Sequence, residues 1–417
     1  MIMAMKESGI EWVGLIPDTW GVIPNKYVMH KEKNLCEKWS GEDVMSLTMN
    51  GVIVRDLQNP TGKMPATFDG YQYIEDGDLL MCLFDIDVTP RCVGRVTHNG
   101  VTSPAYSNFK VHDNASRDYF YYYYLMVDNT KELLHLAKNL RHSFTEEQLG
   151  QLKVPMPLLS EQQTIADYLD ETCSKIDEII EEAKASIDEY KELKQSVIFE
   201  AVTKGLDKNV KMKDSGVEWI GEIPESWNIR MLNQYVSQVK CKNSDLSETN
   251  LLSLSYGKIK RKNINSNDGL LPESFDNYNV VDENDIVLRL TDLQNDHKSL
   301  RVGLVTERGI ITSAYVTIRP NGINAAYLAL LLHAFDYKKG FYGMGSGIRQ
   351  GLTFDGIKSL KIVVPSNFEQ DDIVKHIMKM TEKCDSLISE KESLINDLEA
   401  YKKSLIYEVV TGKRRVV

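Results

Sequence analysis

Residues 5–20 read MKESGIEWVGLIPDTW, and residues 212–227 read MKDSGVEWIGEIPESW. Ten of the sixteen positions are identical, and most of the others are conservative exchanges. A phrase that recurs after about 207 residues indicates an internal duplication. The aromatic and turn-forming residues of the phrase, Trp12, Pro17 and Trp20 in the first copy, are predicted to pack at the start of a folded unit.

Three further pairs of segments align at nearly the same offset. They are VGRVTHNGVTSPAY (93–106) with VGLVTERGIITSAY (302–315), RHSFTEEQLGQLKVPMP (141–157) with RQGLTFDGIKSLKIVVP (349–365), and LKQSVIFEAVTKG (193–205) with YKKSLIYEVVTGK (401–413). The chain is therefore interpreted as a tandem duplication of a unit of about 205 residues. Each unit has a globular first part and a helical second part. The predicted domains are 1–157 and 211–365 for the globular parts, with 158–210 and 366–417 for the helices.

The globular part of each copy shows a mixed α and β pattern. Apolar runs such as LLMCLF (79–84) and DIVLRL (285–290) are short and bounded by polar residues, which is typical of strands. Residues 119–124 and 327–332 begin more helical stretches. We therefore expect a mixed α/β fold for each globular part.

The helical part of each copy shows a heptad pattern. In the second copy, apolar residues recur at steps of four and three, at Ile373, Ile377, Met380, Cys384, Leu387, Leu394, Leu398, Tyr401 and Leu405. No Pro or Gly interrupts about 40 residues, which corresponds to roughly 60 Å of helix. Since so narrow an apolar face needs a partner, we expect the two helices to form an antiparallel coiled coil. The alternative is that each helix packs only on its own globular part.

Composition excludes several classes of protein. The chain of 417 residues has a net charge of −11 and no apolar run of the length that a membrane span requires, roughly 18 residues. The start MIMAMKES lacks the features of a signal peptide, so we expect a cytoplasmic protein. The six cysteines form no CxxC pair and are expected to be reduced and mostly buried.

The acidic total does not exclude nucleic-acid binding, because the charge is unevenly spread. Residues 161–204 carry about twelve acids and five bases, whereas YGKIKRKN (256–263) carries four bases and no acid. The stretches 49–70 and 258–278, rich in Asn, Gly and Pro, are predicted to be long loops and differ most between the copies. The sequence thus allows basic surfaces on a chain that is acidic overall.

Motifs for catalysis are absent from the sequence. It contains no GxxxxGK(S/T) phosphate loop, no HExxH and no GxSxG. FYGMGSG (341–347) matches the FxGxG pattern that amino-methyltransferases use for S-adenosylmethionine, but the companion NPPY/F motif is missing. The eight histidines do not cluster with cysteines or acids. Neither a catalytic residue nor a metal ligand is therefore predicted.

Basic and amide side chains concentrate in the divergent loops and beside the central strands. Arg, Lys, Gln and Asn are the side chains that pair with base edges and phosphates. Arg141 and Arg349 lie at equivalent positions of the duplicated segments, just before a predicted strand. The candidate DNA-binding residues are Lys63, Arg91, Arg95, Arg141, His142, Lys258, Lys260, Arg261, Lys262, Arg289, Arg301, Arg349 and Gln350.

The order of globular region, long helix, globular region and long helix resembles the specificity subunit of type I restriction–modification systems. The resemblance rests on the phrases GIEWVGLIPDTW and GVEWIGEIPESW, on the helix starts PLLSEQQTIADYLDETCSKID and PSNFEQDDIVKHIMKMTEKCD, and on the helix ends SVIFEAVTKG and SLIYEVVTGK. It covers essentially the whole chain, and the phrases occur twice in the right order.

This resemblance implies a fold and a function. The fold class would be α+β: two similar mixed α/β target-recognition domains joined by two long antiparallel coiled-coil helices, a pseudo-twofold tandem duplication. Each domain would read one half of a bipartite site in double-stranded DNA, and the helices would set the gap between the halves. The partners would be two modification subunits, which are DNA adenine methyltransferases, and restriction subunits, with no membrane involved.

The resemblance also implies that the chain itself is not an enzyme and binds no cofactor. S-adenosylmethionine, ATP and Mg are then expected in the partner subunits, which methylate adenine and cleave DNA. Two other interpretations stay open at this point. One is a duplicated coiled-coil scaffold that binds protein without reading bases, and the other is a stand-alone methyltransferase built on FYGMGSG.

Overall fold

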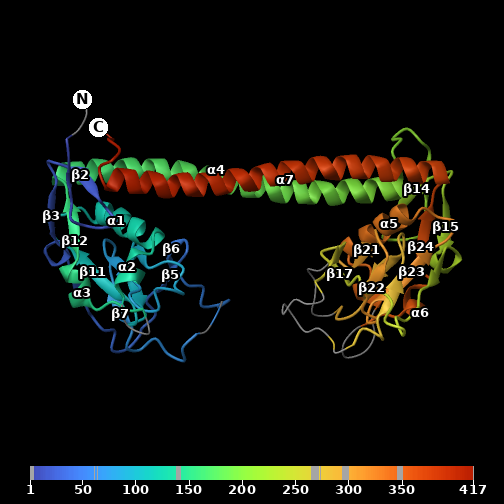
Figure 1. Cartoon of the computed structure of the whole chain (residues 1–417), viewed down its shortest axis with the longest axis horizontal. Coiled ribbons are helices and arrows are strands. Elements are labelled where there is room, and N and C mark those ends of the chain that lie inside the picture. The colour runs from blue at the N-terminus through green and yellow to red at the C-terminus, as the bar shows by residue number, and fades with distance from the viewer. Residues whose placement is uncertain are drawn as a thin grey trace. The chain divides into compact units, whose positions relative to one another are not determined.

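The chain forms two compact units. The computed structural model describes residues 4–60, 62, 64–137, 142–263, 272, 274–293, 300–344 and 351–416. Unit 1 comprises Met1–Ala183 and Ser393–Val417, and unit 2 comprises Lys184–Glu392 (Figure 1). Each unit takes part of both long helices, so this division does not test the domain boundaries predicted from the sequence, which stay a prediction.

Unit 1 contains two four-stranded sheets and two strand pairs. The sheets have the orders β4-β11-β8-β9 and β6-β5-β10-β7, and the pairs are β1-β2 and β12-β3. All neighbours are antiparallel except β5 and β10, which are parallel. The strands are β1 Met5–Glu7, β2 Leu15–Pro17, β3 Gly21–Pro24, β4 Met29–Glu32, β5 Val44–Thr48, β6 Gly51–Val54, β7 Gln72–Ile74, β8 Leu79–Met81, β9 Val93–Arg95, β10 Gly100–Thr102, β11 Ser107–Val111 and β12 Lys153–Met156.

Unit 2 repeats this build with an equivalent set of strands. The four-stranded sheet has the order β16-β23-β20-β21, and the strand pairs are β13-β14, β15-β24, β17-β18 and β19-β22, all antiparallel. The strands are β13 Met212–Asp214, β14 Glu222–Pro224, β15 Asn228–Met231, β16 Val236–Gln238, β17 Leu252–Ser255, β18 Lys258–Arg261, β19 Asn279–Val281, β20 Ile286–Leu288, β21 Val302–Leu304, β22 Gly309–Ile311, β23 Val316–Pro320 and β24 Lys361–Val364.

The shorter helices follow the same duplication. Helix α1 of unit 1 and helix α5 of unit 2 both have 13 residues and begin after a polar capping residue, Ser116 or Asn324. The helices and 3-10 turns are η1 Asn25–Tyr27, α1 Arg117–Asn129, α2 Glu132–Leu136, α3 Glu146–Gln151, η2 Leu232–Gln234, α5 Ala325–Tyr337, η3 Tyr342–Met344 and α6 Phe354–Ile357. The predicted strands at 79–84 and 285–290 and the predicted helical stretches are confirmed.

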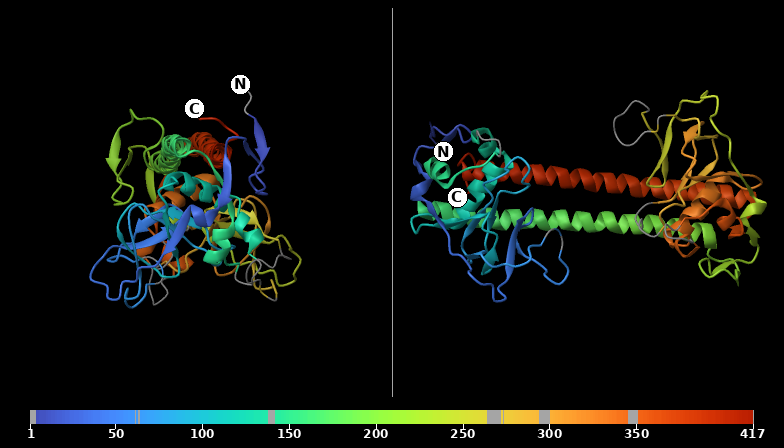
Figure 2. Two further views of the ribbon diagram at one scale, coloured as in Figure 1. Left: turned by 90° about the vertical axis from the view of Figure 1, so that its left-hand side faces the viewer. Right: turned by 90° about the horizontal axis from the view of Figure 1, so that it is seen from below.

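Two long helices, α4 (Leu159–Lys204) and α7 (Asn367–Val410), lie side by side in each unit (Figures 1 and 2). In unit 1, Lys402 of α7 donates to Asp177 of α4 at 2.7 and 2.6 Å. In unit 2, Lys194 of α4 pairs with Asp385 of α7. Since the later part of one helix meets the earlier part of the other in both pairs, the helices run antiparallel, as predicted.

Each globular part packs against both long helices. The core of unit 1 combines Leu169 and Ile176 of α4 with Leu405 and Val409 of α7. The core of unit 2 likewise combines residues from the end of α4 with residues from the start of α7, namely Ile198, Ala201, Val202, Ile373, Val374 and Ile377. The alternative that each helix packs only on its own globular part is therefore wrong. The predicted α+β class, with two similar units and two long antiparallel helices, is confirmed.

The duplicated opening phrase is a packing element, as predicted. Trp20 and Trp227 are both buried, and each lies against the glycine that ends a long helix. A Cβ atom on Gly412 would lie 2.5 Å from Pro17, and one on Gly205 would lie 3.0 Å from the ring of Trp227. Both glycines also have a positive φ, so a side chain is excluded twice over.

One expectation about the loops is wrong. Within the stretches 49–70 and 258–278, residues Gly51–Val54 and Lys258–Arg261 are strands that form hairpins with β5 and β17. The expectation about the cysteines is confirmed, because all six are free thiols and only Cys241 is exposed. Among the described residues, none of the helices has the length and apolar character that crossing a membrane demands.

A buried glutamine joins each long helix to its unit. Gln162 accepts a hydrogen bond from the backbone N–H of Ser116 at 2.8 Å and donates to the carbonyl of Pro157 at 2.9 Å. Gln370 makes the equivalent bonds with Asn324, at 2.8 Å, and Pro365, at 2.9 Å. The duplicated Glu-Gln pair at the helix starts thus holds the residue that caps α1 or α5.

Gln162→Leu and Gln370→Leu are expected to destabilise their own units by similar amounts. Each substitution keeps the size of the side chain but leaves a buried N–H and a buried carbonyl without a partner, at a cost of about 2 kcal/mol. Denaturant unfolding with hydrogen exchange resolved by unit measures the effect. Gln163→Leu is the matched control, because Gln163 is exposed. Equal stability of the Gln162 and Gln163 variants would contradict the assignment.

Candidate nucleic-acid interface

The hairpin β17–β18 presents a polar face to solvent in unit 2. Its cross-strand pairs alternate, and the apolar pair Leu254 and Ile259 packs inward against β21. A Cβ atom on Gly303 of β21 would lie 2.5 Å from Leu254 and 3.0 Å from Ile259, so strand and hairpin are in close contact. The pair Leu252 and Arg261 shares this side by alternation, and the opposite face carries the other two pairs. We call it the basic hairpin face; it consists of Ser253, Ser255, Lys258 and Lys260.

The equivalent hairpin of unit 1, β5–β6, has a different chemistry. Leu47 and Val52 pack inward, and a Cβ atom on Gly94 would lie 2.7 and 2.8 Å from them. The outward pairs are Ser46 with Ile53 and Thr48 with Gly51. Hydroxyl side chains therefore occupy one strand in both units, whereas the two lysines of unit 2 are replaced by Gly51 and Ile53 in unit 1. We call these four residues of unit 1 the neutral hairpin face.

Arg261 and Lys262 continue the basic strand of unit 2. Arg261 has a side chain that is 73% exposed and is held by Glu307, with its Nε atom 2.8 Å from both carboxylate oxygens. The hydrogen bond with Glu307 raises the pKa of Arg261. Lys262 is half-buried, and its backbone N–H donates to Leu251 at 2.8 Å. Arg261 therefore keeps its charge, but a carboxylate already engages it.

Arg301 lies inside unit 2. Its side chain is fully buried, and its guanidinium group donates to the carbonyls of Arg289, Thr291 and Asp292 at 3.0, 2.8 and 3.3 Å. It also lies over the ring of Tyr342, 5.0 Å from the centroid. Arg301 therefore supports the backbone of residues 289–292 and does not face solvent.

Arg95 of unit 1 is also engaged within the protein. It lies on β9 and contacts Asp170 of α4 through two bonds of 3.0 and 2.7 Å, and Asp118 of α1 at 3.1 Å. Burial alone would lower the pKa of Arg95, but the hydrogen bonds and charge of Asp170 raise it above its ordinary value. The guanidinium group also lies 4.6 Å from the ring centre of Tyr121. Arg95 thus ties a strand, a short helix and a long helix together.

Three further predicted residues, Arg91, His142 and Arg289, lie around the loops that follow β8 and β20. Arg91 and Arg289 are half-buried beside β9 and β20. The carbonyl of His142 accepts from the backbone N–H of Ile86 at 3.3 Å, which places the segment before α3 against the loop after β8. In unit 2 the backbone N–H of Leu352 donates to the carbonyl of Leu290 at 2.8 Å, as the N–H of Phe144 does to the carbonyl of Leu83 at 2.7 Å in unit 1. Lys63, Arg141, Arg349 and Gln350 lie outside the described residues.

The segment FYGMGSG is only partly described. Phe341 is buried and packs edge-on against Phe335, with ring centres 4.8 Å apart, and Tyr342 contacts Arg301. The first residues of the segment therefore have a packing role, whereas Gly345–Gly347 lie outside the described residues.

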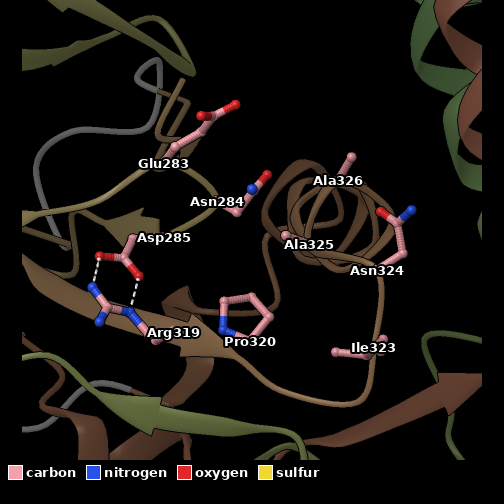
Figure 3. A pocket seen from close by; sticks show the side chains of 9 residues that line it. All are labelled: Glu283, Asn284, Asp285, Arg319, Pro320, Ile323, Asn324, Ala325 and Ala326. Atoms are coloured by element: carbon pink, nitrogen blue, oxygen red, sulfur yellow. Dashed lines mark hydrogen bonds and ion pairs between the residues drawn. The ribbon is translucent and has the colours of Figure 1, made fainter. Parts of the chain in front are cut away.

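A hollow of 560 Å³ lies beside the start of α5 in unit 2. Figure 3 shows that Arg319 on its wall points to Asp285, to which it donates at 2.7 and 2.8 Å. Glu283 adds another carboxylate to the lining. An acidic lining with a paired arginine does not suit a phosphate group. In the part of the chain that the structure describes, no three side chains of the metal-ligating types come together.

Sequence reasoning missed the serines of the basic hairpin face. The alternation LSLS–YG–KIKR, two strand-like runs around a two-residue turn, is a hairpin signal that could have placed them. With the hairpin recognised, the cross-strand pairing alone would have put Ser253 and Lys260 on one face.

Comparisons with known proteins agree with this arrangement. Residues 88–189 match the family model of the type I restriction modification DNA specificity domain. The putative type I restriction enzyme MjaX specificity subunit of Methanocaldococcus jannaschii is 27% identical over 314 residues, which cover 73% of this chain and 69% of that protein.

Two solved structures share the fold. One, from work on complex assembly and conformational transition of the type I R-M system, has a TM-score of 0.67 at 12% identity and covers 96% of this chain and 99% of its own. The HsdS subunit from Thermoanaerobacter tengcongensis has a TM-score of 0.52 at 13% identity, with 96% and 98% covered. The family model, the curated relative and the fold thus agree that this chain is similar to the specificity subunits of type I restriction–modification systems.

Proposed function

We propose that this chain is the specificity subunit of a type I restriction–modification complex and reads an asymmetric bipartite sequence in double-stranded DNA, one half-site with each unit. The observation that carries the proposal is the contrast between the two hairpins. Their inner faces use equivalent apolar pairs on an equivalent glycine, whereas their outer faces differ in charge. Two domains that bind different half-sites need the same internal packing but different exposed side chains, and the two hairpins have this combination.

Under this proposal, the exposed residues among the predicted contacts bind DNA directly, whereas the buried ones position other elements. Lys258 and Lys260 are exposed on the basic hairpin face and would bind phosphates or base edges. Lys63, Arg141, His142, Arg349 and Gln350 stay predicted contacts in or near the divergent loops. Arg95 and Arg301 would act indirectly, by positioning the elements that they join.

The proposal includes the assembly of the enzyme complex. Two modification subunits and the restriction subunits would dock on this chain in the cytoplasm, and they would supply the S-adenosylmethionine, ATP and Mg chemistry. The exposed acidic residues of α4 suit a protein partner better than a phosphate backbone. The two long helices would set the distance between the half-sites.

The test is an exchange of globular parts. Chimaeras in which residues 1–157 or 211–365 come from a relative of different specificity are assembled with the modification subunits, and methyladenine is mapped across a genome. Exchange of one globular part should change one half of the methylated motif and preserve the other. An unchanged motif would refute the proposal and favour a protein-binding scaffold.

Lys258→Gln and Lys260→Gln should weaken DNA binding mainly at low salt. A lysine that neutralises one phosphate contributes about one unit to the slope of log K against log salt, so the double variant should lose about two units. The measurement is a salt titration of DNA binding by the complex with its modification subunits. Lys375→Gln, an exposed lysine on α7, is the control. An unchanged slope would exclude phosphate contacts by the basic hairpin face.

A further inference from the structure

The turn of the basic hairpin contains a strained tyrosine. Tyr256 and Gly257 form the two-residue connection between β17 and β18, and both have a positive φ, 47° and 75°. Two-residue hairpin turns with this backbone favour Asn-Gly or Gly-Gly. A bulky aromatic residue in the left-handed region is unusual, because its Cβ atom crowds the backbone. Tyr256 thus adopts a backbone conformation that is unfavourable for tyrosine and that asparagine adopts more easily.

The scaffold does not require this strain. In unit 1, the equivalent turn joins Thr48 to Gly51 through Met49 and Asn50, and glycine takes the left-handed position with a φ of 95°. Met49 and Asn50 both have a negative φ, in contrast to Tyr256. The same hairpin is therefore closed in unit 1 without a strained bulky residue.

Packing within the chain does not explain the tyrosine either. Its side chain is 79% exposed. The backbone beside it is fixed, since a Cβ atom on Gly257 would lie 3.2 Å from Leu300 and 3.3 Å from His333. A rigidly held turn therefore presents an exposed aromatic ring at the end of a face that carries two lysines. Strain that no internal contact offsets is characteristic of a residue kept for binding.

We infer that Tyr256 is a specificity-determining residue that contacts base edges in the major groove of the half-site read by unit 2. The inference rests on the proposed function. A two-stranded ribbon fits the major groove, where Lys258 and Lys260, both on β18, would bind phosphates beside the tip. The phenol ring offers an apolar surface to a thymine methyl group, and its hydroxyl group can donate to or accept from a base edge.

The variant Tyr256→Asn is expected to change the stability of the protein and its recognition of DNA in opposite directions. The substitution removes the strain and the ring together, so the variant should gain about 2–4 °C in melting temperature without DNA. Its affinity for the selected duplex should fall about tenfold, and base preference should be lost at one or two positions of a single half-site. The probe is a randomised double-stranded DNA library, bound by the complex of the full chain with its modification subunits and followed by sequencing.

Leu246→Asn is the matched control. Leu246 is also exposed and also has a positive φ, 56°, but it lies outside the hairpin. This variant should gain stability in the same way and should select the same DNA as the wild type. Loss of selectivity in both variants would contradict a specific role for Tyr256, as would a Tyr256→Asn variant that selects the wild-type motif with wild-type affinity. A wild-type complex that selects no motif at all would instead refute the proposed function.

Discussion

Arg301→Met is expected to lower the stability of unit 2 by about 4 kcal/mol, because it removes a buried guanidinium group and leaves three backbone carbonyls without its donors. The guanidinium group of Arg301 binds the carbonyls of Arg289, Thr291 and Asp292 from a fully buried position. Methionine has a similar length but cannot donate a hydrogen bond. Residues 289–292 should therefore loosen, and the backbone amides of this segment should exchange faster than those of unit 1.

Arg301→Lys is expected to restore only part of the loss. A guanidinium group directs several N–H donors in a fixed plane, whereas an ammonium group is a compact charge that cannot reach all three carbonyls at once. Hydrogen exchange resolved by segment measures the stability of unit 2. We expect this stability to be highest in the wild type, lower in Arg301→Lys and lowest in Arg301→Met.

Arg308→Lys is the control for these variants. Arg308 is exposed, and its ion pairs with Glu248 and Asp282 should contribute less than about 1 kcal/mol. A loss in Arg301→Met no greater than that in Arg308→Lys would show that the buried bonds do not stabilise the segment.

Arg301 also shows why the site could be predicted from the sequence only in part. Its backbone N–H donates to Asp336 at 2.7 Å, and the equivalent bond in unit 1 joins Cys92 to Asp128 at 2.7 Å. The backbone arrangement is thus shared, whereas one side chain is an arginine and the other a cysteine. A sequence gives the type of residue, but it does not show whether a backbone carbonyl or a DNA phosphate accepts the hydrogen bonds of its side chain.

The fold was more predictable than the site, because its signals are repeated and periodic. The heptad pattern predicted the long helices, and residues such as Leu169 and Leu405 do lie in the core. The duplication predicted two similar units. The hairpins were missed because Gly51 and Gly257 read as loop residues, whereas both close a pair of short strands. Short elements are defined by cross-strand partners, which local composition does not reveal.

In unit 1, an ion network around Arg95 connects strand β9 with helices α1 and α4. Arg95→Leu should destabilise unit 1 by about 3 kcal/mol, because removing one member of a partly buried ion network leaves the others uncompensated. Asp118 is one of the two carboxylates that Arg95 contacts. Burial alone would raise the pKa of Asp118, but hydrogen bonds and charges from Arg117 and Arg95 lower it below its ordinary value.

The pH dependence of this loss has a defined sign. A carboxyl group with a lowered pKa in the folded state contributes stability above its unfolded pKa, about 4, and that contribution disappears as the pH falls through the folded value. The difference between wild type and Arg95→Leu should therefore be fully present at neutral pH and should narrow below about pH 4. An exposed arginine substitution in unit 2, Arg230→Leu, should show neither the loss nor the pH dependence.

Unit 2 itself provides the compensating variant. The positions equivalent to Arg95, Asp118 and Asp170 are occupied there by Leu304, Ala326 and Met378. The triple variant Arg95→Leu, Asp118→Ala and Asp170→Met should regain most of the stability lost in Arg95→Leu, since removing a whole ion network is much less costly than removing one partner. Urea unfolding at pH 7 compares the three proteins. A triple variant as unstable as the single one would mean that Arg95 acts by filling space, as its contact with Tyr121 permits, and not by balancing the two carboxylates.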